Sequence, residues 1–238
     1  AARQHPNSLI TPKLLNSDGT VNACGLEMHY TGITSCRGLG DESERHTGIF
    51  SVPLVSGAAF LAPKWLLSDL NGFDASYFMY LEDADLSLRA RAKGYAIHCV
   101  ADAVVTHAYM ADMSPSKFFY LERNRLLTLV RLYQTRTLYR IAGALLLTEF
   151  ATWAFALLKG PRYLSRKGAG YLWLWRNRGE WLAARRAFQQ TRNIFDDKLL
   201  EEGTTALPFD QLVASKQLAN LLGRITQPLY ALLRPSGP

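Results

Sequence analysis

The sequence predicts an α/β domain at residues 1–133, followed by a helical region at residues 134–238. Two patterns indicate the domain: short apolar runs alternate with helical periodicity as far as residue 133, and turn signals separate them. A third observation is the balance of 48% hydrophobic and 20% charged residues, which is sufficient to build a buried core. From about residue 138 the pattern becomes helical, which predicts a helical tail.

The first part opens with strand signals. Residues 8–15 form a short apolar run that Pro12 interrupts, so an edge strand is expected. A turn follows at Asn16-Ser17-Asp18-Gly19, because Asp-Gly adopts positive φ at low cost. Residues 21–30 can return as the second arm of a hairpin, and residues 31–47, rich in glycine and charge, predict a mobile loop.

Strand and helix signals alternate through the rest of the first part. Proline is favoured in the first turn of a helix, and glycine is favoured just after its end. The expected elements, in chain order, are a buried strand at 50–61, a helix from Pro63 to Leu70, an aromatic connector at 73–81, a helix from Glu82 to Gly94, short strands at 95–100 and 103–107, and a helix from Ser114 to Tyr133.

Basic charge and tryptophan concentrate in the second part. The chain has a net charge of +7, and residues 134–198 alone carry 12 Lys/Arg against four Asp/Glu. Four of the five tryptophans lie in the same stretch. Tryptophan and arginine both favour lipid headgroups, so this composition predicts an anionic membrane surface as a partner. Nucleic acid is not expected, because the sequence has none of the standard base-reading or stacking motifs.

Residues 141–158 carry a single charge, Glu149, and reach the lower limit for a helix that spans a bilayer. A spanning helix, a helix lying in the membrane plane and a buried docking helix all fit this pattern. Glu149 at the centre disfavours insertion of the helix alone, and the flanking basic residues favour the in-plane arrangement. Further amphipathic helices are expected at 171–200 and 209–233.

Three carboxylates, Glu82, Asp83 and Asp85, fall within four residues at the start of a predicted helix. Acidic residues suit this position because of the helix dipole, so a solvated first turn is one interpretation. A carboxylate placed here can also act as a general base when it lies within about 3 Å of an acceptor hydroxyl. The spacing alone leaves both alternatives open.

Eight short motifs follow one another in a fixed order over about residues 6–130. They are Val55-Ser56-Gly57-Ala58, Gly72-Phe73-Asp74, Tyr77-Phe78-Met79-Tyr80, Glu82-Asp83-Ala84-Asp85-Leu86, Arg89, Gly94-Tyr95, Ala103 to His107 and Arg123-Asn124. Each motif is weak alone, and the ordered set is specific. It resembles the acceptor-binding half of family 2 glycosyltransferases with the GT-A fold, especially rhamnosyltransferase-like enzymes of bacterial polysaccharide synthesis. Asn71 is a departure, since the family usually has glycine there.

The resemblance implies a role for each matched residue. Asp83 would be the general base that deprotonates the acceptor hydroxyl, and Glu82 would orient the acceptor. His107 would help to ligate a divalent cation, Mg²⁺ or Mn²⁺. Arg123 and Asn124 would support the site or contact phosphate. The cleft for the acceptor and the donor sugar would be lined by Gly57, Ala58, Phe73, Asp74, Tyr80 and Asp85.

The donor-binding elements of that family have no counterpart in the sequence. Asp83-Ala84-Asp85 has the form of the family's Asp-x-Asp metal motif, but it opens a helix and is not assigned to that role. No glycine-rich phosphate loop precedes residue 50. The resemblance therefore implies that the chain is the C-terminal portion of a longer transferase, whose upstream half holds most of the cation site.

The expected function is inverting transfer of a sugar from a nucleotide-sugar donor, with dTDP-rhamnose as one candidate, to a glycan or lipid-linked acceptor. The resemblance and the basic tail together imply cell-surface polysaccharide synthesis at the cytoplasmic face of the cell membrane. The alternative is a non-catalytic remnant or accessory subunit that binds glycan or membrane without a donor site. The ordered motifs argue against a third class, a basic module that binds membrane or nucleic acid.

Overall fold

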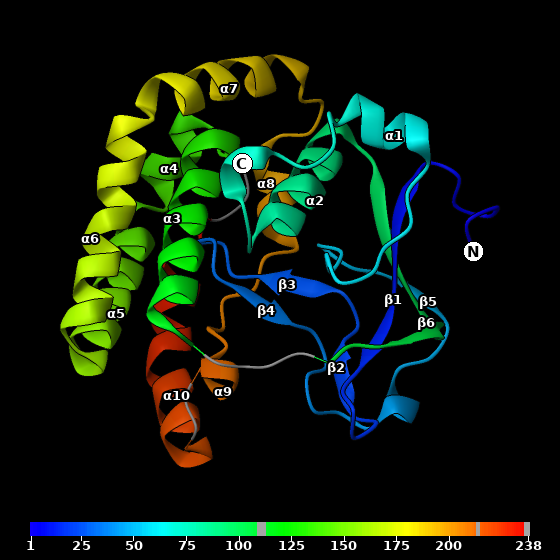
Figure 1. Ribbon diagram of the computed structural model, residues 1–238, viewed down its shortest axis with the longest axis horizontal. Coiled ribbons are helices and arrows are strands. Elements are labelled where there is room, and N and C mark those ends of the chain that lie inside the picture. Colours follow the sequence, from blue (N-terminus) through cyan, green and yellow to red (C-terminus); the bar gives the residue numbers. More distant parts are fainter. Residues whose placement is uncertain (109–112, 213–214, 236–238) are drawn as a thin grey trace.

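The computed structural model describes residues 1–108, 113–212 and 215–235, and its architecture is mixed α/β (Figure 1). This confirms the predicted fold class at the level of α/β. Four strands form a mixed sheet in the order β2-β1-β6-β5, and two more form a small separate sheet. The strands are β1 (Ser8–Leu15), β2 (Val21–Ala23), β3 (Leu26–Met28), β4 (Thr34–Cys36), β5 (Ile49–Ser51) and β6 (Ala96–Thr106).

Strand β1 lies inside the sheet, so the prediction of an edge strand was wrong. It pairs with β6 in parallel on one side and with β2 in the antiparallel sense on the other. Proline cannot donate to a strand ladder, which is why Pro12 suggested an edge. The pairing with β6 shifts register between Pro12 and Lys13, so the missing donor falls at an irregularity in the ladder.

Three other predictions about strands need correction. The expected mobile loop at 31–47 contains β4, which pairs with β3, and a short 3₁₀ helix, η1 (Ser43–Arg45). The expected long strand at 50–61 is mostly loop beyond β5, because Pro53 has no amide proton to continue a ladder. The two short strands expected near 95–107 are one strand, β6.

The helices of the first part begin and end close to their expected positions. They are α1 (Lys64–Asp69), η2 (Ala75–Tyr77), α2 (Glu82–Lys93) and α3 (Pro115–Leu132). Gly94 ends α2 with a φ of 95°, a conformation that favours glycine. At the start of α3, the Ser114 hydroxyl accepts a hydrogen bond from the Lys117 amide at 3.2 Å, which is the expected N-cap.

The second part is helical in the described residues. Its elements are α4 (Thr135–Arg140), α5 (Ala142–Lys159), α6 (Pro161–Arg176), α7 (Arg178–Thr191), α8 (Asp196–Glu201), α9 (Phe209–Leu212) and α10 (Lys216–Leu233). The expected helix at 171–200 is therefore divided among α6, α7 and α8. In Figure 1, α5 and α6 stand beside α3, on the opposite side of the molecule from β1 and β6.

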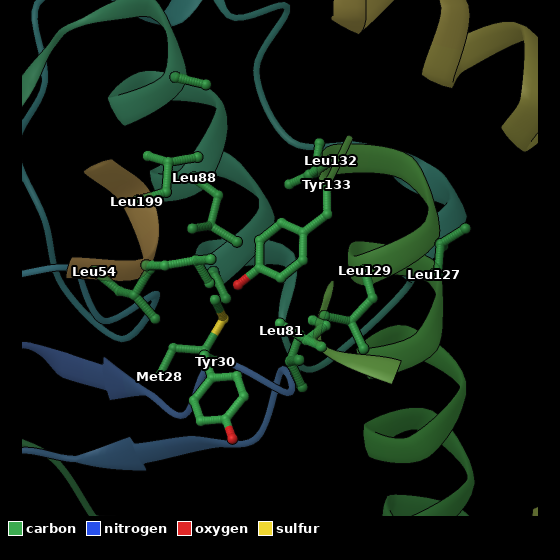
Figure 2. Close-up of a cluster of buried hydrophobic side chains, with 14 of the residues drawn as sticks. Met28, Tyr30, Leu54, Leu81, Leu88, Leu127, Leu129, Leu132, Tyr133 and Leu199 are labelled. Atoms are coloured by element: carbon green, nitrogen blue, oxygen red, sulfur yellow. The ribbon is translucent and has the colours of Figure 1, made fainter. Parts of the chain in front are cut away.

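The two parts share one hydrophobic core (Figure 2). Met28, Leu54 and Leu88 from the first part meet Leu199 from α8. Tyr30 also belongs to this cluster, and its hydroxyl donates a hydrogen bond to the backbone oxygen of Tyr230 at 2.8 Å. Burying one large apolar side chain contributes about 1.5–3 kcal/mol, so residues from both parts stabilise the same interior.

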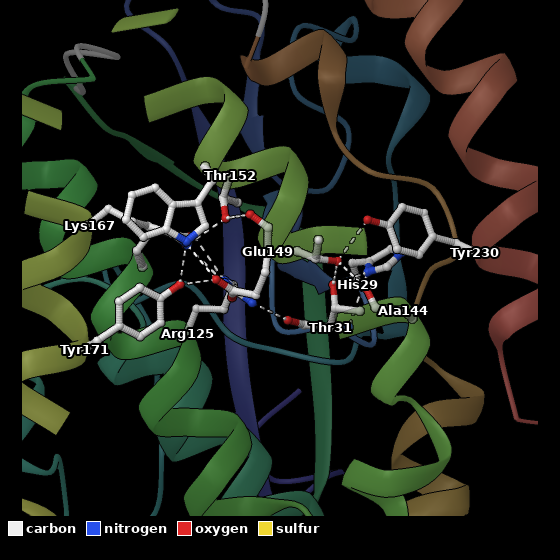
Figure 3. A network of polar contacts seen from close by, with 12 residues as sticks. His29, Thr31, Arg125, Ala144, Glu149, Thr152, Lys167, Tyr171 and Tyr230 are labelled. Atoms are coloured by element: carbon white, nitrogen blue, oxygen red, sulfur yellow. Dashed lines mark hydrogen bonds and ion pairs between the residues drawn. The ribbon is translucent and has the colours of Figure 1, made fainter. Parts of the chain in front are cut away.

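A buried ionic network joins α3, α5 and α6 (Figure 3). Arg125 and Lys167 each contact the carboxylates of both Glu122 and Glu149, so two positive charges meet two negative ones. The Tyr171 hydroxyl donates to Glu149. Within the described residues, α5 is the helix that is long and apolar enough to cross a membrane. The ionic network binds Glu149, the one charged residue inside the apolar stretch of α5, on the side of the helix that faces α3 and α6.

Candidate active site

The acidic cluster at the start of α2 follows a strained turn. Phe78, Tyr80 and Leu81 are not glycines, yet all three have positive φ, at 62°, 63° and 62°. Phe78 is the centre of a γ-turn of the strained type: its ψ is −59°, and the Met79 amide donates to the Tyr77 carbonyl at 2.7 Å. Left-handed residues with a Cβ cost about 1–2 kcal/mol each and persist only when their surroundings hold them. We call residues 78–81 the left-handed turn.

Asn124 of α3 holds this turn. Its side-chain amide donates to the carbonyl of Tyr77 at 3.0 Å, of Met79 at 2.9 Å and of Tyr80 at 2.6 Å. The Asn124 side chain has no exposed surface, so these carbonyls replace water as its partners. The two N–H groups of one side chain are therefore shared among three carbonyls within four residues, immediately before the acidic cluster.

Arg123 binds the segment just before the turn. Its Nη2 donates to the carbonyls of Ser76 at 2.8 Å and Tyr77 at 2.6 Å. The ring of Trp173 from α6 lies 4.4 Å from the guanidinium, within the range of a cation–π contact. Arg123 and Asn124 were expected either to support the site or to contact phosphate. These hydrogen bonds to backbone carbonyls correspond to the supporting role.

Asp83 is fixed against the loop that follows β5. Its Oδ2 accepts a hydrogen bond from the Gly57 amide at 2.7 Å, and its Oδ1 accepts one from the Ala84 amide at 2.8 Å. Burial raises the pKa of Asp83, and these amide bonds oppose that rise. A Cβ added at Gly57 would lie 3.2 Å from Asp83 Oδ2, so glycine is what permits this close approach.

Glu82 lies beside Asp83 with a different environment. Its Oε2 is buried and, among the described residues, no hydrogen-bond partner reaches it. Burial and the neighbouring Asp83 charge both raise the pKa of Glu82. The pair thus combines a carboxylate held by two backbone amides with a neighbouring carboxylate that has one oxygen without a partner among the described residues.

Two residues near Asp83 had no signal in the sequence. Burial raises the pKa of Cys36 on β4, the Asp83 charge raises it further, and the Lys117 charge opposes the rise. The Lys117 ammonium also lies 5.5 Å from the centre of the Tyr80 ring. Tyr80, one of the expected cleft residues, therefore contacts α3. Only the folding of β4 onto this region brings Cys36 into electrostatic range of Asp83, and the folding of α3 brings Lys117 into range of Cys36.

The structure separates Asp74 and Asp85 from Asp83, in contrast to the single cleft expected. Two residues along a helix correspond to about 200° of rotation, so Asp85 faces away from Asp83. Asp85 is fully buried and accepts a hydrogen bond from Arg89 Nε at 2.8 Å, a pairing that their separation of four helical residues favours. Asp74 Oδ2 lies 2.7 Å from Arg131 Nη2, and Nη1 of the same guanidinium lies 3.9 Å from Asp85 Oδ1. Through Arg131 of α3, both carboxylates connect α3 to the segments that contain Asp74 and Asp85.

The remaining expected cleft residues lie at the surface. Ala58 is exposed beside Gly57. Phe73 is half exposed and packs edge to face on Phe60, with the ring centres 5.8 Å apart. Because Phe60 belongs to the loop that carries Gly57, this contact ties Phe73 to the same loop.

His107 does not complete a metal site in the described part of the chain. It follows β6, and its backbone amide donates to the Leu15 carbonyl at 2.8 Å. No group of three His, Cys, Asp or Glu side chains in residues 1–108, 113–212 and 215–235 could hold a metal ion. A divalent cation needs more oxygen or nitrogen ligands than His107 supplies, so the described residues do not fit one.

No model of a known protein family matches the chain, and no curated protein shows significant sequence similarity to it. Function is therefore inferred from the geometry around Asp83.

Proposed function

We propose that the chain is the acceptor-binding portion of an inverting glycosyltransferase of GT-A type, with Asp83 as its general base. The observation that carries the proposal is the Asp83 carboxylate itself: it is half-buried, its pKa is raised, and the Gly57 amide holds it at 2.7 Å. A base needs a fixed position and a pKa closer to the working pH than that of an ordinary aspartate. The ordered motifs of the sequence supply the reaction class.

The reaction assigns one step to each carboxylate. The acceptor hydroxyl donates a hydrogen bond to Asp83 and attacks the anomeric carbon of the donor sugar. As the new carbon–oxygen bond forms, Asp83 takes the hydroxyl proton, and the bond to the nucleotide diphosphate breaks on the opposite face. The nucleoside diphosphate leaves with the bonding electron pair, and attack on the face opposite to it inverts the configuration at the anomeric carbon. Glu82 accepts a hydrogen bond from a second acceptor hydroxyl and orients the sugar. No step is assigned to a cation, because the described residues do not form its site.

Membrane association is the second element of the proposal. The apolar face of α5 exposes side chains three or four residues apart, at Leu146, Phe150, Trp153 and Leu157. The apolar face of α10 does the same at Leu218, Leu221, Ile225, Leu229 and Leu232. Apolar helix faces next to basic residues support shallow, in-plane binding to an anionic membrane. This arrangement would place the base near a glycan or lipid-linked acceptor at the cytoplasmic face.

Replacing the base tests the enzymatic proposal. In the full-length protein, Asp83→Asn is expected to lower kcat of transfer by about 10²–10⁴-fold, the range of general-base catalysis. The assay uses a panel of nucleotide-sugars that includes dTDP-rhamnose, with lipid-linked acceptors. Asp197→Asn, which removes the same charge from an ion pair with Arg140 in the second part, is the matched control.

Full activity of Asp83→Asn would reject Asp83 as the base. If the full-length protein binds acceptor glycan or membrane but no nucleotide-sugar, the alternative of a non-catalytic accessory subunit is supported instead.

A further inference from the structure

We propose that Asn124 is the positioning residue of this site: it clamps the left-handed turn and thereby fixes Asp83 against the Gly57 amide. The inference rests on the proposed function only in naming Asp83 as the base. The clamp consists of the contacts from the Asn124 amide to three carbonyls of the turn, and it can be tested without substrate.

The left-handed turn needs a clamp because its own residues disfavour it. Phe78, Tyr80 and Leu81 all carry a Cβ that crowds the backbone at positive φ. The Phe78 side chain is 71% exposed, and its ring packs on Tyr120 of α3 with the ring centres 5.4 Å apart, so it buries little surface. The turn therefore persists only if contacts from outside it compensate for the strain.

Asn124 supplies those contacts from a rigid element. Its amide reaches the carbonyls of Tyr77, Met79 and Tyr80, and thus brackets the strained γ-turn at Phe78. Arg123 Nε donates to Asn124 Oδ1 at 2.8 Å, which fixes the amide with its nitrogen towards the carbonyls. Arg123 itself bonds only the carbonyls of Ser76 and Tyr77 among these backbone groups, so it anchors the approach to the turn.

The end of the turn sets the direction of the catalytic carboxylate. Leu81 is the N-cap residue of α2, and its carbonyl accepts the Asp85 amide at 2.9 Å to open the helix. Asp83 lies inside this first helical turn. A change in the backbone at Leu81 therefore rotates the start of α2 and moves the Asp83 carboxylate away from the Gly57 amide.

Asparagine fits this position for two reasons. Its side chain donates from a nitrogen one methylene from the backbone of α3, which is short enough to stay rigid. An aspartate of the same shape has no N–H groups and would bring negative oxygen atoms against three carbonyls. Asn124→Asp is thus nearly isosteric, and it reverses the interaction.

The experiment measures the turn and the carboxylate directly in the full chain. In Asn124→Asp and Asn124→Ala, hydrogen exchange of the amides at residues 77–84 is expected to accelerate at least tenfold. The carboxyl carbon of Asp83, followed by NMR titration, is expected to show a pKa that rises further above that of an ordinary aspartate, because the Gly57 amide bond that lowers it is lost. Where transfer can be assayed, kcat falls and KM for the donor stays the same.

A strain-relief variant separates positioning from general damage to α3. Phe78→Gly removes the crowding at the centre of the γ-turn at an exposed position. In the Asn124→Ala background it is expected to restore much of the exchange protection and of the Asp83 titration. Gln189→Ala is the matched control, because Gln189 also donates an amide to carbonyls of α3, at Leu132 and Arg131.

The proposal is overturned if Asn124→Asp leaves the exchange of residues 77–84 and the Asp83 titration unchanged. It is also overturned if Gln189→Ala changes them as strongly as Asn124→Ala does. A protein that shows the clamp but no transfer would refute the transferase proposal alone. If Asn124→Asp does not fold, Phe78→Gly in the native background decides: a clamp that works against strain predicts slower exchange in the turn, and faster exchange contradicts it.

Discussion

The Glu149 carboxylate of α5 lies 3.0 Å from the Lys167 ammonium of α6, inside the protein. Arg125 of α3 binds the same carboxylate, so the only charge within the apolar stretch of α5 is neutralised on the side that faces α3. A bilayer-spanning α5 would have to break these pairs and carry Glu149 into hydrocarbon. The pair with Lys167 thus favours an α5 that keeps its contacts with α3 and α6 over one that spans a bilayer.

Removal of Glu149 is expected to destabilise the fold. Glu149→Ala leaves Arg125 and Lys167 with an excess of buried positive charge, a situation that costs about 3–5 kcal/mol when one partner of a buried pair is lost. We expect a value near the lower limit, because the Glu149 side chain keeps some exposure. Urea unfolding measures the change. Glu180→Ala, which removes an exposed acid from α7, should leave the unfolding free energy nearly the same.

The apolar face of α10 is expected to contribute directly to membrane binding. The double substitution Leu221→Ser and Ile225→Ser removes two exposed apolar side chains. Each contributes about 1.5–3 kcal/mol when buried, so binding to vesicles with anionic lipid should weaken at least tenfold. Sedimentation with such vesicles at low and high salt measures this.

Salt should weaken binding of the native chain too, because basic residues contribute. The control Gln217→Ser and Asn220→Ser, at exposed polar positions on α10, should retain native binding. Native binding by the Leu221/Ile225 variant would exclude this face as the contact surface.

Gly57→Ala is expected to impair the site without affecting the fold. The new methyl would lie 3.2 Å from Asp83 Oδ2 and would displace the carboxylate by a few tenths of an ångström. Transfer rates depend steeply on such displacements, and a tenfold loss of kcat with an unchanged melting temperature is expected. Gly179→Ala adds the same methyl on α7, where it meets no atom within 4 Å, and should be neutral.

His29 makes the stability depend on pH. Burial is the main cause that lowers the pKa of His29 to about 3, against an ordinary value of 6.5. Between these values the unfolded chain binds a proton that the folded chain excludes, so stability falls as the pH falls through that window. The slope reaches up to about 1.4 kcal/mol per pH unit for one group.

His29→Phe retains an aromatic ring beside Tyr30 and Tyr230 and cannot titrate. Unfolding free energies of the native and His29→Phe chains, compared from pH 7 to pH 4, isolate this contribution. We expect the difference between them to shift in favour of the variant as the pH falls. A difference independent of pH would contradict the buried, neutral histidine.

The sequence predicted elements well where local chemistry decides them. Helices α2 and α3 begin and end as expected, since Ser114 caps one and Gly94 ends the other. Strands were harder, because pairing depends on partners that are distant in sequence. Pro12 lies inside the sheet because its partner β6 has a register shift there, and β4 exists because β3 is adjacent.

The candidate site also contains residues that local motifs identified and residues that only tertiary packing brings together. The sequence motifs identified Asp83 and Gly57, and the 2.7 Å hydrogen bond joins them. The motifs grouped Asp85 with the cleft, and they could not show that it is fully buried on the other side of α2, where it pairs with Arg89. Cys36 was missed because tertiary packing alone brings it into range of Asp83, and Lys117 was missed because packing alone brings it into range of Cys36.

The hydrogen bond from Tyr30 to the backbone of Tyr230 joins residues that are 200 positions apart. A nascent chain that ends after α2 therefore lacks α10, which packs on Tyr30 in the folded protein. Loop-closure entropy over so long a segment also slows this step. During synthesis the core around Met28 and Tyr30 is therefore completed only when α10 has been made.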